Sequence, residues 1–145
     1  MRKILNYQFV IIFSIVFGLI ISGCITPAPV RNSVQDLIGV WVGSYTGANQ
    51  GETGLTLNVF MEGEEYKAIF HFYNLPGQTN AAEGRYYMNV SYDGSRYYLN
   101  WYEWIENPAN YIYGDIVGVI RGNIFSGSII VQGHGSNIDF RLSRR

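Results

Sequence analysis

Apolar and polar residues alternate along one segment after another between residues 40 and 142, and this period of two constrains the fold more than any other feature. The cleanest case is residues 54–61, in which every second residue from Leu55 to Met61 is apolar. Successive side chains in a strand point to opposite faces, so such alternation is typical of a strand with one buried face. No segment after the amino-terminal apolar run keeps a helical apolar period for long. The sequence therefore predicts an all-β domain.

Eight segments are predicted to be strands, and turns join most of them directly. The predicted strands are residues 40–45, 54–61, 66–73, 83–92, 97–104, 116–121, 124–131 and 138–142. Asp93-Gly94 is the strongest hairpin signal, because both central residues of a type I′ turn need positive φ. Residues 46–53, 75–82 and 106–113 are predicted to be longer connections. Successive hairpins of this kind predict an antiparallel meander.

A meander of eight strands has two exposed edges unless the sheet closes on itself. Closure into a small up-and-down β-barrel removes both edges, and this is the fold that we expect. A two-sheet β-sandwich built from the same strands is the alternative. The 17 glycines and 12 tyrosines of the chain suit strands and tight turns.

The amino terminus has the pattern of a signal peptide. Arg2 and Lys3 precede a nearly continuous apolar run over residues 9–21, which ends in Ile21-Ser22-Gly23-Cys24. A branched apolar residue, two small residues and a cysteine in this order resemble the lipobox of bacterial lipoproteins. The resemblance implies cleavage between Gly23 and Cys24 and attachment of a diacylglyceryl group to the Cys24 thiol. An uncleaved transmembrane helix with an incidental cysteine is the alternative.

The lipobox resemblance predicts how the chain is divided and where it resides. Residues 1–23 are the helical signal peptide, 24–35 are the lipidated cysteine with a proline-containing tether, and 36–145 are a single β-domain. Two acyl chains anchor a protein stably where one does so only marginally. We therefore expect an extracytoplasmic lipoprotein on the outer membrane or on the outer face of the cell membrane.

The composition of the mature chain argues against several classes of function. Cys24 is the only cysteine, so its lipidation leaves no disulfide, cysteine metal ligand or cysteine nucleophile. Two of the 10 basic residues lie in the leader, which leaves 8 basic against 11 acidic residues and a formal charge of −3. This mild negative charge argues against nucleic acid as a partner.

Residues suited to catalysis are sparse and scattered. The two histidines, His71 and His134, have no second histidine or carboxylate at a metal-ligand spacing. No nucleophile elbow, phosphate-binding loop or zinc-protease motif is present. We therefore predict no catalytic residue, no metal and no cofactor, and an extracytoplasmic hydrolase is the least favoured function.

Aromatic residues are concentrated in the segment Tyr97–Trp104. Strict alternation places Tyr97, Leu99 and Trp101 on one face, and Tyr98, Tyr102 and Trp104 on the other. Aromatic residues on both faces exceed the needs of one core and suggest a recognition surface. The candidate residues for this surface are Trp101, Tyr102, Trp104 and Tyr111.

Three kinds of target are consistent with such a domain. The surface or the barrel mouth would bind a small apolar ligand, a carbohydrate or an envelope protein. An apolar cavity lined by Trp41, Tyr45, Phe72 and Tyr86 would favour a small ligand. In the alternative, Trp104 and Tyr111 fold over the barrel end as a plug, and the domain is a structural module without a cavity.

Two resemblances agree with the predicted fold. Gly39-Val40-Trp41 is similar to the Gly-x-Trp opening of lipocalins, avidins and other calycins, which are up-and-down barrels that bind small ligands. That resemblance implies an arginine of the last strand over Trp41. Arg141 is the candidate, although alternation places it on the face opposite Phe140.

The second resemblance covers most of the mature chain and is to an uncharacterised bacterial β-domain. It is carried by Trp41-x-Gly43-x-Tyr45, Gln50-Gly51-x-Thr53-Gly54-Leu55-x-Leu57, Ala68-x-Phe70-x-Phe72, Trp104-Ile105-x-x-Pro108-x-x-Tyr111 and Phe140-x-Leu142. It implies the fold and no activity.

Overall fold

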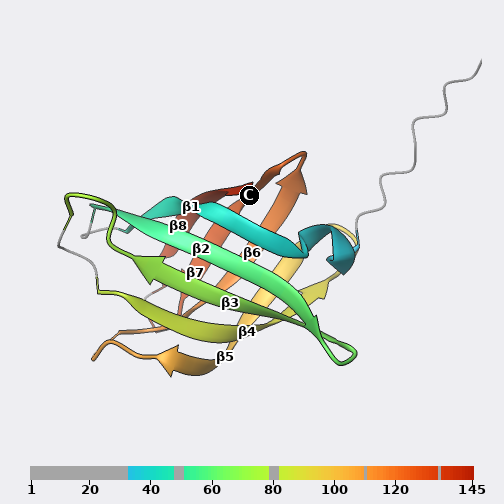
Figure 1. The fold of residues 1–145 in the computed structure, drawn as a ribbon, viewed down its shortest axis with the longest axis horizontal. Helices are drawn as coiled ribbons and strands as arrows, with labels where there is room; N and C mark the ends of the chain where they lie inside the picture. The colour runs from blue at the N-terminus through green and yellow to red at the C-terminus, as the bar shows by residue number, and fades with distance from the viewer. Residues whose placement is uncertain (1–32, 48–50, 79–81, 110, 134) are drawn as a thin grey trace, which may run out of the picture. The chain divides into compact units, whose positions relative to one another are not determined.

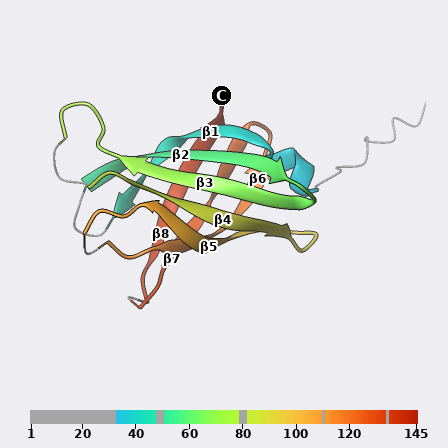
Figure 2. The same cartoon turned by 60° about the horizontal axis from the view of Figure 1, so that its bottom comes forward.

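The described residues form a closed antiparallel β-barrel of eight strands in sequence order (Figure 1, Figure 2). The computed structural model describes residues 33–47, 51–78, 82–109, 111–133 and 135–145. The last strand pairs with the first, with Trp41 opposite Arg144. The predicted up-and-down barrel is therefore confirmed, and the two-sheet sandwich is excluded. The strands are β1 (Gly39–Gly47), β2 (Gly51–Glu62), β3 (Glu65–Tyr73), β4 (Gly84–Tyr92), β5 (Tyr97–Glu106), β6 (Gly114–Arg121), β7 (Ile124–Val131) and β8 (Asn137–Arg144).

A short 3-10 helix, η1 (Val34–Leu37), precedes the first strand. The backbone N–H of Ser33 donates to the Asp36 carboxylate at 2.9 Å, which fixes the start of η1. The helix begins inside the segment 24–35, which was predicted to be tether, so the folded part starts earlier than the predicted residue 36.

The predicted signal peptide, its cleavage site at Gly23 and Cys24, and most of the tether lie outside the described residues. Within the described ranges, no helix is long and apolar enough to cross a membrane.

Closure of the barrel depends on close contact between β1 and β8. Gly43 lies opposite Leu142, and a Cβ at Gly43 would lie 2.1 Å from the carbonyl oxygen of Arg141. Any side chain at this position would therefore push the two strands apart.

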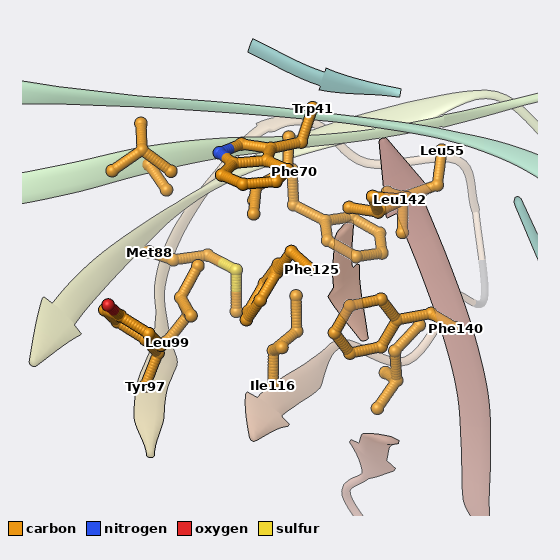
Figure 3. Packing of buried hydrophobic residues seen from close by; sticks show 14 of the residues in the cluster. Trp41, Leu55, Phe70, Met88, Tyr97, Leu99, Ile116, Phe125, Phe140 and Leu142 are labelled. Carbon is orange, nitrogen blue, oxygen red and sulfur yellow. The ribbon is translucent and has the colours of Figure 1, made fainter. Parts of the chain in front are cut away.

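Inward-facing side chains of η1 and of all eight strands form one apolar core (Figure 3). At its centre, the ring of Phe125 on β7 lies 5.9 Å from Trp41 on β1, 6.0 Å from Tyr97 on β5 and 5.1 Å from Phe140 on β8. The strand β7 pairs with β6 and β8, so the contacts with Trp41 and Tyr97 cross the interior. Side chains therefore fill the barrel at this level.

Two predicted details of the strands are wrong. Met61 was expected to share the buried face of Leu55 and Val59, yet it is 51% exposed. The pairing of β1 with β2 stops at Gly39 and Val59, so Met61 projects beyond the core. Residues 46–53 were expected to be a connection, but β1 and β2 extend into this segment and Thr53 is fully buried.

The hairpin after β4 forms where it was predicted, with a different turn. Tyr92 pairs with Tyr97, so four residues rather than two connect the strands. The Asp93 carboxylate accepts hydrogen bonds from the backbone N–H groups of Ser95 and Arg96, each at 2.8 Å. The side chain of Asp93 thus organises the turn.

The two ends of the barrel differ in their connections. At the η1 end, two-residue turns join β2 to β3 and β6 to β7, and η1 lies beside them (Figure 1, Figure 2). The described parts of the longer connections, residues 74–78, 82–83, 107–109, 111–113, 132–133 and 135–136, lie at the opposite end, here called the loop end. A binding site at the loop end would be formed by strand ends and their connections.

Candidate functional site

Arg144 and η1 cover the η1 end of the barrel. The Trp41 side chain is fully buried, and its ring N–H donates to the carbonyl oxygen of Leu37 at 2.8 Å. The guanidinium of Arg144 lies 4.3 Å from the centre of the Trp41 ring and donates to the carbonyl oxygens of Ile38, at 2.7 Å, and Asp36. The ring of Trp41 is therefore held at the η1 end by its hydrogen bond to Leu37 and by Arg144.

The arginine over Trp41 is Arg144, and the candidate Arg141 is wrong. Arg141 is exposed on the outer face of β8. Arg144 has the same parity along β8 as Phe140 and Leu142, which are both buried. The alternation of the last strand, extended by two residues beyond Leu142, would have identified it.

Two β-bulges near the end of β5 place the Trp104 side chain on the face opposite to the one that strict alternation predicted. Met88 pairs with Trp101 and Tyr87 with Glu103, which leaves Tyr102 as an extra residue. A second shift leaves Ile105 extra. Strict alternation placed Trp104 on the face opposite Leu99, but after the first bulge it pairs with Tyr86 and points inward.

Six residues meet inside the barrel at the loop end and are here called the loop-end cluster. They are Tyr45, Thr53, Phe72, Tyr86, Trp104 and Tyr111. The rings of Phe72 and Tyr111 are stacked, with centres 4.8 Å apart and planes 14° apart. Trp104 meets Phe72 and Tyr86 edge to face, at 6.4 Å and 5.0 Å. The cluster thus combines packed aromatic rings with several hydroxyl groups.

The side chains of Tyr45, Thr53 and Tyr86 carry hydroxyl groups into the buried interior. Burial raises the pKa of Tyr45 well above its usual value; the neighbouring Tyr111 acts in the same direction and the Thr53 hydroxyl in the opposite one. Burial also raises the pKa of Tyr86, whose hydroxyl donates to the carbonyl oxygen of Gly114 at 3.1 Å. Both tyrosines are therefore neutral hydrogen-bonding groups at ordinary pH.

Thr53 is the polar residue whose position is hardest to explain by packing alone. Its side chain is fully buried, and its Oγ1 has no hydrogen-bond partner of good geometry among the described residues. An unpaired buried hydroxyl costs about 1–3 kcal/mol. Sequence reasoning missed Thr53 because it was assigned to a connection, although it shares the parity of Leu55 and Leu57.

Gly84 allows the connection after β5 to approach the cluster. A Cβ at Gly84 would lie 2.6 Å from the Phe72 ring and 2.7 Å from the Cδ of Pro108. Because Gly84 has no side chain, Pro108 packs close to Phe72. The backbone N–H of Tyr111 then donates to the carbonyl oxygen of Pro108 at 3.1 Å, which directs Tyr111 toward the barrel interior.

Trp101 lies at a seam where β5 and β6 separate. These strands pair only through Tyr97, Tyr98 and Leu99 of β5. Beyond this point the Trp101 backbone N–H donates to the Asp115 carboxylate at 2.7 Å, and the Trp101 ring stacks on Tyr113 at 4.3 Å. The ring N–H of Trp101 is buried and lacks a partner among the described residues.

The four predicted recognition residues are therefore divided among three environments. Trp104 and Tyr111 belong to the loop-end cluster, whereas Trp101 lies at the seam. Tyr102 is 53% exposed on the outside, with the Lys67 ammonium 5.0 Å from its ring centre.

Ion pairs on the outer face of β3 and β4 do not form an evident catalytic site. His71 contacts the Glu83 carboxylate at 2.9 Å, and Arg85 pairs with Glu106. These side chains are partly exposed; Arg85 and Glu106 are paired residues of β4 and β5, whereas Glu83 directly precedes β4. Such pairs are typical of a solvated sheet face. Among the described residues, no group of three or more metal-ligating side chains converges, and His134 lies outside those residues.

No known protein family, curated protein or solved structure matches this chain. Its function is therefore inferred from the geometry of the barrel.

Proposed function

We propose that this protein is an extracytoplasmic lipoprotein whose β-barrel domain binds a small, largely apolar ligand at the loop-end cluster without transforming it. The observation that carries the proposal is the buried hydroxyl of Thr53, which has no hydrogen bond of good geometry among the described residues and lies beside the ring of Tyr45. Ligand sites are typically apolar, with a few polar groups that fix the orientation of the ligand. The site belongs to the loop end, since Arg144 and η1 cover the other end.

The filled centre of the barrel limits the size of the ligand. Phe125 contacts Trp41 and Tyr97 across the interior, and Phe70 stacks on Tyr86 at 4.7 Å. A ligand bound at the loop end therefore cannot extend deep into the barrel while these contacts persist.

The test of ligand binding is to purify the full-length protein from its native host and identify co-purifying small molecules by mass spectrometry. We expect a compound that is retained by the protein and depleted in Trp104→Leu, because Trp104 encloses the cluster. Trp101→Leu, at the seam, is the matched control and should retain the compound. Identical small-molecule profiles for all three proteins would contradict the proposal.

The membrane anchor is the second part of the proposal, and its support comes from the order of charge, apolar run, small residues and Cys24. We expect Cys24→Ser to abolish metabolic labelling with palmitate, because the thiol is the attachment point of the lipid. Continued labelling of the Cys24→Ser protein would contradict lipidation at this residue.

Recognition of an envelope protein is a second candidate function. The two extra residues of the β5 bulges, Tyr102 and Ile105, are 53% and 37% exposed. A strand that projects an aromatic and an aliphatic side chain outward offers an apolar contact for a partner. Loss of a cross-linked envelope protein in Tyr102→Ser, with the small-molecule profile unchanged, would favour this function.

A further inference from the structure

Tyr111 differs from the other members of the loop-end cluster in how the fold holds it. Tyr45, Thr53, Phe72, Tyr86 and Trp104 belong to β1 to β5, where ladder hydrogen bonds fix their backbones. Tyr111 belongs to the connection between β5 and β6. Because a connection can rearrange without breaking the sheet, Tyr111 is the member that can leave the cluster at the least cost.

The surroundings of Tyr111 match those that a bound phenol would require. Its ring is stacked on Phe72, and the edge of Trp104 meets Phe72 from another direction. Its hydroxyl interacts with that of Tyr45. The Thr53 hydroxyl, in register with Tyr45, is buried beside them; it lies close enough to affect the pKa of Tyr45, yet it forms no hydrogen bond of good geometry among the described residues. The walls of the site are therefore supplied by strands, and one aromatic ring with a hydroxyl group fills it.

We infer that Tyr111 is a displaceable internal occupant of the ligand site, and that the ligand carries a single hydroxylated ring of phenol type that takes its place. The ligand ring stacks on Phe72, and its hydroxyl reaches Tyr45 and provides Thr53 with a hydrogen-bond partner. This inference rests on the proposed function and specifies the class of ligand.

If the ligand displaces the Tyr111 ring, the affinity of the protein for the ligand should depend on whether that ring is present. A ligand that competes with an internal group binds with an apparent affinity reduced by the fraction of molecules whose site is vacant. Removing the Tyr111 ring removes this competition. Removing the Thr53 hydroxyl instead reduces the advantage of a hydroxylated ring over the same ring without its hydroxyl, because only Tyr45 is left to bind the ligand hydroxyl.

The experiment compares p-cresol with toluene, which lacks the hydroxyl, by equilibrium dialysis against the full-length protein in phospholipid nanodiscs, with empty nanodiscs subtracted. We expect the wild-type protein to bind p-cresol in preference to toluene. Tyr111→Ala should bind p-cresol at least about tenfold more tightly. Thr53→Val should show a smaller preference for p-cresol over toluene than the wild type. Tyr113→Ala, at the neighbouring tyrosine that stacks on Trp101, should match the wild type.

Three results would overturn the inference: no binding of p-cresol by the wild type, an unchanged affinity in Tyr111→Ala, or an undiminished preference for p-cresol in Thr53→Val. Absence of p-cresol binding by the wild type would mean that Tyr111 is a permanent part of the core. If far-UV circular dichroism shows that Tyr111→Ala does not fold, the inference is tested by comparing the preference for p-cresol over toluene in the wild type and in Thr53→Val. A compound co-purifying from the native host that lacks a hydroxylated ring would overturn this inference while leaving the proposed function intact.

Discussion

At each end of the barrel, one residue has a role that its residue type alone would not predict. Arg144 is a surface arginine, yet it covers a buried tryptophan and donates to two backbone carbonyl groups of the segment that precedes β1. Thr53 is a small polar residue, yet it is completely buried among aromatic rings. Each residue has the same parity as the buried residues of its strand. Arg144 lies at the η1 end and Thr53 at the loop end, and this position decides the role of each.

The role of Arg144 leads to a prediction about stability. We expect Arg144→Met to lower the free energy of unfolding by about 1–2 kcal/mol, because charged hydrogen bonds and a cation–π contact are lost at a partly solvated site. Urea denaturation measures this change. Arg141→Met, on the outer face of the same strand, is the matched control and should change stability by less than about 0.5 kcal/mol. Equal effects of the two substitutions would show that Arg144 does not hold η1 in place.

At the scale of elements, irregularities in the strands decide which side chains meet. The bulges at Tyr102 and Ile105 bring Trp104 inward and leave two apolar side chains outside. The separation of β5 from β6 beyond Leu99 makes room for the connection that carries Tyr111 and Tyr113. The candidate site therefore exists because β5 departs from a regular strand.

The turn between β4 and β5 gives a prediction about acid stability. The backbone N–H groups of Arg96 and Ser95, followed by the Tyr98 hydroxyl, lower the pKa of Asp93. A lowered pKa in the folded state stabilises the protein above the unfolded-state value of about 3.9, and this stabilisation is lost as pH falls through the folded-state value. We therefore expect Asp93→Ala to unfold at a lower urea concentration than the wild type at neutral pH. The difference should shrink progressively as the solution is made more acidic than about pH 4.

The control for this prediction is Glu64→Ala, which removes an exposed carboxylate from the turn between β2 and β3. It should leave the urea midpoint at neutral pH nearly unchanged. A difference between wild type and Asp93→Ala that stays constant across the acid range would show that the charge of Asp93 does not organise its turn.

At the scale of the whole molecule, a closed barrel buries tyrosines from several strands in one interior. Burial raises the pKa of Tyr97 to about 12, and it raises the pKa values of Tyr45 and Tyr86 as well. Each of these groups titrates at a lower pH in the unfolded chain than in the barrel. Their ionisation is therefore linked to the loss of the entire fold rather than to a local change.

This linkage predicts that the barrel becomes unstable in alkali. A raised folded-state pKa contributes stability that is complete below the unfolded-state value of about 10 and is lost as pH rises toward the folded-state value. We expect the free energy of unfolding to fall by about 1.4 kcal/mol per pH unit above pH 10 for each tyrosine that ionises only on unfolding. Urea denaturation at several alkaline pH values measures this slope, and Tyr86→Phe should reduce it. Tyrosinate absorbance from every tyrosine before any loss of strand signal would contradict the prediction.

The sequence by itself determined the local structure and the fold class. Period-two alternation specifies strands and their buried faces, as in Leu55 and Leu57, and short turns such as Gly122-Asn123 specify antiparallel neighbours. Eight consecutive hairpin-linked strands leave few arrangements other than a barrel or a sandwich. These features are predictable because each depends on residues that are close together in the chain.

Only the tertiary structure decided which residues meet at the loop end. Trp104 joins Phe72 because of bulges that no local pattern announces, and Thr53 joins Tyr45 because both strands extend farther than their alternation suggested. Closure of β8 on β1 places Arg144 over Trp41, more than a hundred residues apart in the sequence. Such contacts depend on the register between strands and on the curvature of the closed sheet, which are fixed by all eight strands together.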